Sequence, residues 1–391
     1  MQNSKEKLID FAALCLWIVT SIVIAVYVFI HFGQDFCVYY AAARILLERG
    51  NPYDYAQIAR VLLEVTSRIE NNGFYYPLWF GWFITPFSLL PFQTARAAWM
   101  IFNWAMWLIG LIRLQQLLEF PRMGWRASLT NLLATFIFAW TTWKFEQIGI
   151  VLFVIMVEIL FTYKKQQWNR MGIFLGLALI KPNVMLLPVV ALLLWLIRNR
   201  DWRPVATMAL LLVGLVAITI VLTPNWYQPL LQPHFGQGLT VFLDGPHRIT
   251  GTRLNTTLLD WLKWFSVQKN LRIAIYIAVA FIAVLILGTS VWKSKLILEV
   301  VVVSLLISFA ITPYALQYDF PPLVIVLFWA LSRLNSAKMK LIPVLIVAFI
   351  ASVLIWEHPI SDGYWIVIGL SVLTFLASKS SANINFSQSS A

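Results

Sequence analysis

Long apolar runs separated by short basic loops are the feature of this chain that most restricts its fold. The 391 residues are 60% hydrophobic and only 12% charged, and their mean hydropathy is +0.78. A soluble protein of this size carries about 25% charged residues, and a helix needs about 20 apolar residues to cross a bilayer. Several runs approach that length, so the sequence predicts an all-α polytopic membrane protein.

The net charge of +12 does not indicate a nucleic-acid partner. The basic residues lie in short loops between the apolar runs, which is the pattern that orients a chain in a membrane. The N-terminal run follows Lys5 and Lys7, is too long for a signal peptide and has no cleavage site after it. We therefore expect it to remain as an anchor.

Placing the basic loops on the cytoplasmic side gives about twelve crossings and puts both termini in the cytoplasm. The alternation holds only if residues 76–91, which include Pro86, do not cross. We expect that segment to dip into the outer leaflet or to pack on the bundle. The expected crossings are 9–31, 94–118, 126–142, 146–163, 170–181, 183–197, 204–222, 271–291, 296–311, 320–333, 341–356 and 363–378.

Residues 1–378 are expected to form a single transmembrane domain. Its two long extracytoplasmic segments are a first loop at 33–93, which contains juxtamembrane helices, and a later loop at 223–270. The tail at 379–391 is rich in Ser and Asn, so we expect it to be disordered in the cytoplasm.

The first loop places one carboxylate, Asp35, where the chain leaves the membrane. A helix predicted at 36–49 follows, and a more exposed one at 54–69. Chemistry on lipid-linked substrates needs an acid that faces both water and lipid. One face of the helix predicted at 36–49 is apolar and should lie on the bilayer surface. This face consists of Val38, Ala41, Ala42, Ile45 and Leu46.

Each polar candidate has a structural alternative to a chemical role. Asp35 could cap its helix or act as a general base. Lys181 could snorkel to the interface or bind a lipid phosphate. Gln147 could belong to a polar rim at a helix end, and Asp319 could be a cap.

The remaining candidates lie in the two outer loops. His247, Arg248 and Arg253 could touch anionic head groups or clamp a leaving phosphate. Asn255 begins an N-glycosylation sequon, which is a weak motif. Aromatic residues could form interfacial belts or stack on a sugar, and the candidates for stacking are Tyr39, Tyr75 and Trp79.

No motif for a metal or a nucleotide is present in the sequence. Cys15 and Cys37 have neither metal-type spacing nor the numbers for a disulfide framework, and Asp35 is followed by Phe36 rather than a second acid. We therefore expect neither a metal nor another cofactor.

Six segments in this order resemble the GT-C superfamily of membrane glycosyltransferases, and most closely glycosyltransferase family 87. That family includes polyprenyl-phosphate-mannose-dependent mannosyltransferases. The segments are VYYAAARILLERGNPYD after Asp35, then YYPLWFGWFITPFSLLP, FEQIGIVLF, LALIKPNVMLLP, TRLNTTLLDWL and ITPYALQYDF. One position departs from the family, which often has Gly before the glutamine of the third segment, where this chain has Glu146.

The resemblance implies a GT-C fold with Asp35 as catalytic base, and Lys181 with the Arg248 and Arg253 region at the donor phosphate. It implies a polyprenyl-phosphate-linked sugar donor, and a lipid or glycan acceptor. The expected location is a prokaryotic plasma membrane, with the active site on the extracytoplasmic face. We expect the protein to be a monomer.

Other classes remain open on the sequence alone. A transporter or flippase of lipid-linked saccharides could use the same basic groove, but such proteins usually show internal repeats with matched broken helices, and none is visible here. Another GT-C-like ligase or polymerase, or a structural membrane subunit, are further alternatives.

Overall fold

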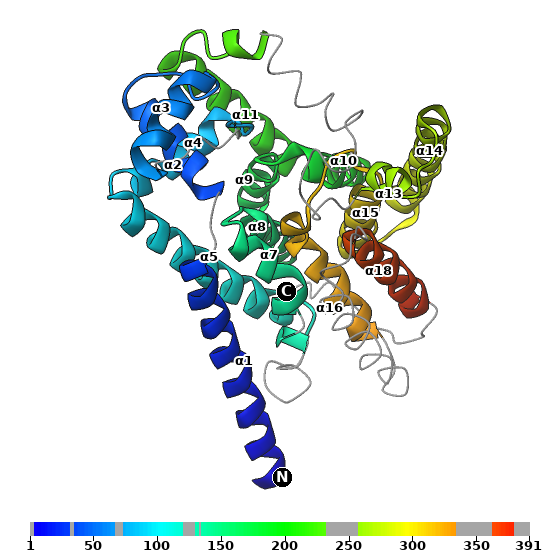
Figure 1. Cartoon of the computed structure of the whole chain (residues 1–391). Coiled ribbons are helices and arrows are strands. Elements are labelled where there is room, and N and C mark those ends of the chain that lie inside the picture. Colours follow the sequence, from blue (N-terminus) through cyan, green and yellow to red (C-terminus); the bar gives the residue numbers. More distant parts are fainter. Residues whose placement is uncertain are drawn as a thin grey trace.

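The structure is a computed structural model that describes residues 4–31, 35–66, 73–119, 130–132, 134–231, 257–333 and 362–378. These residues form helices and no strands, which confirms the all-α prediction (Figure 1). The α-helices are α1 Ser4–His31, α2 Asp35–Leu47, α3 Tyr55–Thr66, α4 Leu78–Ser88, α5 Phe92–Leu117, α7 Trp140–Lys144, α8 Gly149–Lys164, α9 Trp168–Ala178, α10 Pro182–Arg198, α11 Trp202–Leu222, α13 Leu258–Trp264, α14 Lys269–Lys293, α15 Ile297–Ile311, α16 Val324–Arg333 and α18 Asp362–Ser378. Shorter elements are the π-helix η1 Thr135–Ala139 and the 3₁₀-helices η2 Gln228–Leu231, η3 Gln317–Asp319 and η4 Pro321–Leu323.

Three of the described helices, α5, α11 and α14, are long and apolar enough to cross a membrane. Helices α11 and α14 leave most of their apolar side chains exposed, which suits a surface that faces lipid. Helix α1 extends away from the other helices, with its N-terminal end farthest from them (Figure 1). The expected crossing at 341–356 lies outside the described residues. The count of about twelve crossings stays a prediction.

Polar contacts join helix ends that the charge alternation places on one side of the membrane. Lys164 at the end of α8 pairs with Glu119 after α5 at 3.6 Å. Arg333 at the end of α16 pairs with Glu299 at the start of α15 at 3.3 Å. Arg198 at the end of α10 donates to a backbone carbonyl in the last turn of α14 at 2.8 Å. These contacts agree with the predicted alternation of α5, α8, α10, α14, α15 and α16.

Helix α2 corrects one expectation. We expected only one face of it to be apolar and to lie on the bilayer surface, but nearly all of its residues are buried in protein. Helices α3, α4 and α5 pack around it, and the packing is close because α4 carries Gly81. A Cβ at Gly81 would lie 2.6 Å from Leu46 Cδ1. Helix α4 has 11 residues, fewer than a crossing needs.

The first outer loop also contacts the chain after α11. Asn51 Nδ2 donates to the Trp226 carbonyl at 3.3 Å, and the rings of Tyr53 and Trp226 lie 6.2 Å apart. Helix α4 packs on α11 as well (Figure 1). The two segments predicted to be extracytoplasmic loops therefore meet where the second one begins.

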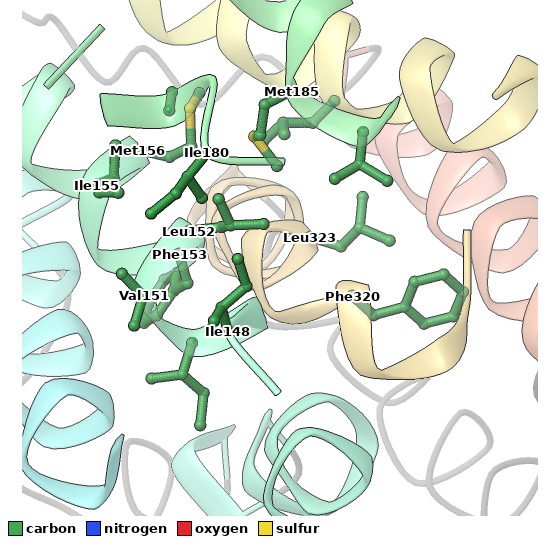
Figure 2. Packing of buried hydrophobic residues seen from close by; sticks show 14 of the residues in the cluster. Ile148, Val151, Leu152, Phe153, Ile155, Met156, Ile180, Met185, Phe320 and Leu323 are labelled. Atoms are coloured by element: carbon green, nitrogen blue, oxygen red, sulfur yellow. The ribbon is translucent and has the colours of Figure 1, made fainter. Parts of the chain in front are cut away.

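The core centres on α8, whose first nine residues are all apolar and which packs against α5, α9, η4 and α16. Figure 2 shows residues of this helix together with Ile148, Ile180, Phe320 and Leu323 from the segments around it. Three polar residues, Gln147, Lys181 and Asp319, are immediate chain neighbours of these core residues. Packing of the core therefore fixes the backbone positions of those three residues.

Candidate active site

Asp35 and Tyr39 lie one turn apart on α2, so their side chains are on the same side of the helix. Asp35 is the first residue of the helix, where a carboxylate interacts favourably with the helix dipole. It is partly exposed, whereas Tyr39 is buried. Phe36 anchors this end of the helix by stacking on Trp99 of α5, with ring centroids 5.6 Å apart.

Gln147 connects the polar side chains of the site. Its Nε2 donates to Asp35 Oδ2. Its Oε1 accepts hydrogen bonds from the hydroxyl groups of Tyr39 at 2.6 Å and Tyr76 at 2.9 Å, and it lies 3.5 Å from Lys181 Nζ. The amide is buried in the turn between α7 and α8 and thus bridges α2, the segment before α4 and the start of α10.

Lys181 and Asp319 form a buried ion pair beside this amide. Lys181 Nζ lies 2.5 Å from Asp319 Oδ1, and the two residues are 5% and 0% exposed. The Lys181 backbone lies outside the helical region, with φ −132° and ψ 78°, because Pro182 begins α10 directly after it. Asp319 Oδ2 accepts from the Leu316 amide at 3.1 Å, so Asp319 caps its short helix while it pairs with Lys181.

Aromatic rings surround the Lys181 ammonium group. Its nitrogen lies 4.7 Å from the centroid of the Tyr318 ring and 5.6 Å from that of Tyr76. Contacts of this kind stabilise a cation that has lost its water. The ammonium group is thus held inside the protein rather than extended to an exposed surface.

The surroundings of Asp35 favour a carboxyl that takes up a proton more readily than usual. Burial raises the pKa of the Asp35 carboxyl above its ordinary value, against the hydrogen bond from Gln147 and the charge of Lys181, which lower it. The negative charge of Asp319 adds to the upward shift. A carboxylate in such a position can accept a proton from a hydroxyl group placed against it.

The structure brings together five of the residues named from the sequence and separates two. Asp35, Tyr39, Gln147, Lys181 and Asp319 are in the connected cluster described above. In contrast, Tyr75 is 62% exposed and Trp79 packs against the apolar core. His247, Arg248, Arg253 and Asn255 lie outside the described residues.

Sequence reasoning missed two tyrosines of the cluster, Tyr76 and Tyr318. Both lie directly beside positions that were named, Tyr75 and Asp319. The two tyrosines belong to the quoted segments, in the tripeptides YYP and QYD. A loop, however, has no fixed period that tells which of two neighbouring residues points inward. Among the described residues, no three His, Cys, Asp or Glu side chains are grouped so that they could hold a metal ion.

The fold and the site together define a helical membrane protein with a buried polar cluster where several helices end. A family model described as glycosyltransferase family 87 matches residues 74–313. Because this range is more than half of the chain, the protein belongs to glycosyltransferase family 87. The range includes Tyr76, Gln147 and Lys181, whereas Asp35 precedes it and Asp319 follows it. No curated protein and no solved structure matched the chain.

Proposed function

We propose that this glycosyltransferase moves a hexose, mannose in the first instance, or a pentose from a polyprenyl-phosphate donor to a hydroxyl group of a lipid-linked or glycan acceptor. Asp35 is the general base, and the anomeric configuration is inverted. The observation that carries the proposal is the Asp35–Gln147 hydrogen bond, because it holds a partly exposed carboxylate beside the cation Lys181.

The proposed reaction is a direct displacement. The acceptor hydroxyl attacks the anomeric carbon and gives its proton to the Asp35 carboxylate as the new C–O bond forms. The bond from the anomeric carbon to the phosphate oxygen breaks, and the polyprenyl phosphate leaves with the electron pair. A positioned base contributes about 10²–10⁴-fold to the rate of such a step.

Positive side chains are assigned to the leaving phosphate in this proposal. Lys181 provides one charge, and we assign the others to His247, Arg248 and Arg253. Cations that act on developing negative charge in a site with little water lower the barrier substantially. A lipid phosphate is already an anion that these groups can bind, so the proposal includes no metal and no other cofactor.

The sugar and the acceptor are assigned to residues of the cluster and to two aromatic residues, Tyr75 and Trp79, that lie outside it. Tyr75 is exposed enough to stack on a sugar ring, and Trp79 lies four residues further along the chain, in the first turn of α4. Gln147 and Asp319 would orient polar groups near the base, and Asn255 is assigned to the same substrate surface. Tyr39 acts through its hydrogen bond to Gln147.

The proposed setting is the plasma membrane, with both termini in the cytoplasm, the site on the extracytoplasmic face and the protein a monomer. Its partners are then the lipid-linked donor, the acceptor and the surrounding lipids. Nucleic acid has no place in this reaction.

Sugar transfer by the purified protein in lipid nanodiscs tests the proposal. The assay presents polyprenyl-phosphate sugars that differ in the sugar and a panel of glycolipid acceptors, and the anomeric configuration of the product is read by NMR. We expect turnover with one donor class and a product anomer opposite to that of the donor. Retention of configuration contradicts direct displacement, and binding of lipid-linked sugar without turnover favours a transporter.

A further inference from the structure

The turn that carries Gln147 has an unusual residue at its left-handed position. After α7, the Glu146 amide donates to the Trp143 carbonyl at 3.0 Å and the Gln147 amide donates to the Thr142 carbonyl at 2.9 Å. Glu146 has a φ of 54°. This pair of hydrogen bonds is a Schellman motif, whose left-handed residue is usually Gly because other side chains strain the backbone there.

Glu146 differs from the other residues in this conformation. The described part of the chain has positive φ at seven non-glycine residues, and Glu146 is the only buried one among them. The other six end or follow helices at exposed positions; they are Arg49, Glu119, Gln166, Arg200, Asn225 and Ser266. Burying an unpaired carboxylate costs free energy, so Glu146 needs a partner, whereas the exposed residues can be solvated by water.

Helix α5 provides that partner and holds the same residue at a second point. The Arg96 guanidinium pairs with the Glu146 carboxylate, which is 1% exposed. Trp99 Nε1 donates to the Glu146 carbonyl at 2.8 Å. Arg96 and Trp99 are three residues apart and therefore share one side of α5. Trp99 also stacks on Phe36, the residue after Asp35.

We propose that Glu146 and Arg96 are positioning residues, whose ion pair holds the left-handed turn that directs the Gln147 amide onto Asp35. The inference rests on the proposed function, since it assigns these residues to the geometry of the same base. Neither residue touches a substrate in this account. Arg96 and Trp99 of α5 place the turn, and the stacking of Trp99 on Phe36 places Asp35 against it.

The experiment compares wild type, Arg96→Met, Glu146→Gly and the double variant, with Gln166→Gly as the matched control at an exposed left-handed position. Arg96→Met keeps the strained backbone and removes the partner of Glu146. We expect it to lower kcat about tenfold or more, with the donor KM little changed, because a small misplacement near a reacting group is costly. The acidic limb of the rate profile should move to higher pH, since Asp35 loses the hydrogen bond that lowers its pKa and the nearby Glu146 carboxylate loses its counter-charge.

Rescue by glycine separates positioning from simple loss of stability. Gly adopts the left-handed conformation without strain and carries no carboxylate, so the double variant should regain most of the lost kcat and the original pH profile. Gln166→Gly should leave both unchanged. A double variant no faster than Arg96→Met, or an Arg96→Met enzyme with the wild-type rate and profile, would overturn the proposal.

Hydrogen exchange gives a second result that does not depend on turnover. The amides of Glu146 and Gln147 should exchange faster in Arg96→Met and return toward the wild-type rate in the double variant. If wild type transfers no sugar, the proposed function fails while this measurement still decides the inference. Unchanged exchange in Arg96→Met would show that the ion pair does not hold the turn.

Discussion

Gln147 is the residue on which the geometry of the proposed base depends. Its amide donates to Asp35 and accepts from Tyr39 and Tyr76, and these contacts join segments that are far apart in the sequence. A hydrogen bond donated to a carboxylate stabilises the ionised form and so lowers its pKa. Gln147 thus sets both the orientation of Asp35 and the pH range in which Asp35 can accept a proton.

Gln147→Met should move the acidic limb of kcat to higher pH. In the proposed mechanism Asp35 accepts a proton only when ionised, so the rate is full above its pKa and falls as the pH drops through it. Loss of the hydrogen bond raises this pKa, because the bond stabilises the ionised carboxylate. Lys181, Asp319 and Glu146 also act on Asp35 through their charges, and all three are unchanged in the variant.

The control for this profile is Gln115→Met, which removes a buried amide outside the site. The Gln115 amide donates to Asn131 Oδ1 with a donor–acceptor distance of 3.0 Å. Its acidic limb should stay at the wild-type pH. A Gln147→Met limb that moves to lower pH would contradict the assigned role of the hydrogen bond.

Lys181→Met should be strongly destabilising because it leaves the Asp319 carboxylate buried without its cation. Breaking a buried pair from one side costs about 3–5 kcal/mol, whereas neutralising both partners often costs little. The double variant Lys181→Met with Asp319→Asn should therefore recover much of the thermal stability but not the activity. Arg60→Ala, which breaks an exposed pair with Glu48, serves as control and should melt like wild type. Equal melting temperatures of the single and double variants would contradict this account.

Residue identities were largely predictable here, whereas their contacts were not. Asp35, Gln147, Lys181 and Asp319 stand out in the sequence because isolated polar residues next to apolar runs are costly to bury. The Arg96–Glu146 pair did not stand out, since a pairing across 50 positions leaves no local pattern. Tyr76 was missed in favour of Tyr75 because a loop has no fixed period that tells which of two neighbours points inward.

At the scale of elements, the start of α8 and the segment around η3 touch where Gly149 faces the Tyr318 carbonyl. A Cβ on Gly149 would lie 2.0 Å from that oxygen. Gly149→Ala must therefore push η3, which carries Asp319, away from the start of α8. Overpacking of this kind costs about 1–3 kcal/mol, so both the melting temperature and the activity should fall.

The matched control is Gly214→Ala in α11, where a Cβ would meet nothing within 4 Å. Alanine favours a helix interior over glycine, so this variant should be as stable as wild type or slightly more. Wild-type activity in Gly149→Ala would show that the contact between α8 and η3 does not position Asp319.

Helix α2 shows why an element can be predicted while its surroundings are not. Its residue range follows from the apolar spacing and from the turn at Gly50. The same apolar spacing suits a helix on a bilayer surface and a helix in a protein groove. Small residues favour the groove only when the packing partner is known. Ala41, Ala42 and Ala43 are fully buried because α3, α4 and α5 pack around α2, and this packing places Asp35 in a partly enclosed position.

For the whole molecule, the charge pattern predicts which helix ends share a side, and the ion pairs between those ends agree with it. Thiol labelling tests the orientation. In a background with Cys15→Ala and Cys37→Ala, a membrane-impermeant reagent should label Tyr75→Cys in intact cells and Lys165→Cys only after permeabilisation. Both positions are exposed. The reverse pattern would place the site in the cytoplasm and contradict the proposed topology.

The measurement that tests the central claim most directly is the transfer rate of Asp35→Asn at saturating donor. Asn has nearly the same shape but cannot take the proton, so we expect kcat to fall about 10²–10⁴-fold while donor affinity stays close to that of wild type. Asp201→Asn, at the start of α11, changes an acid away from the site and should keep the full rate. An Asp35→Asn enzyme as fast as wild type would contradict the account and move the base to another carboxylate, Asp319 or Glu146.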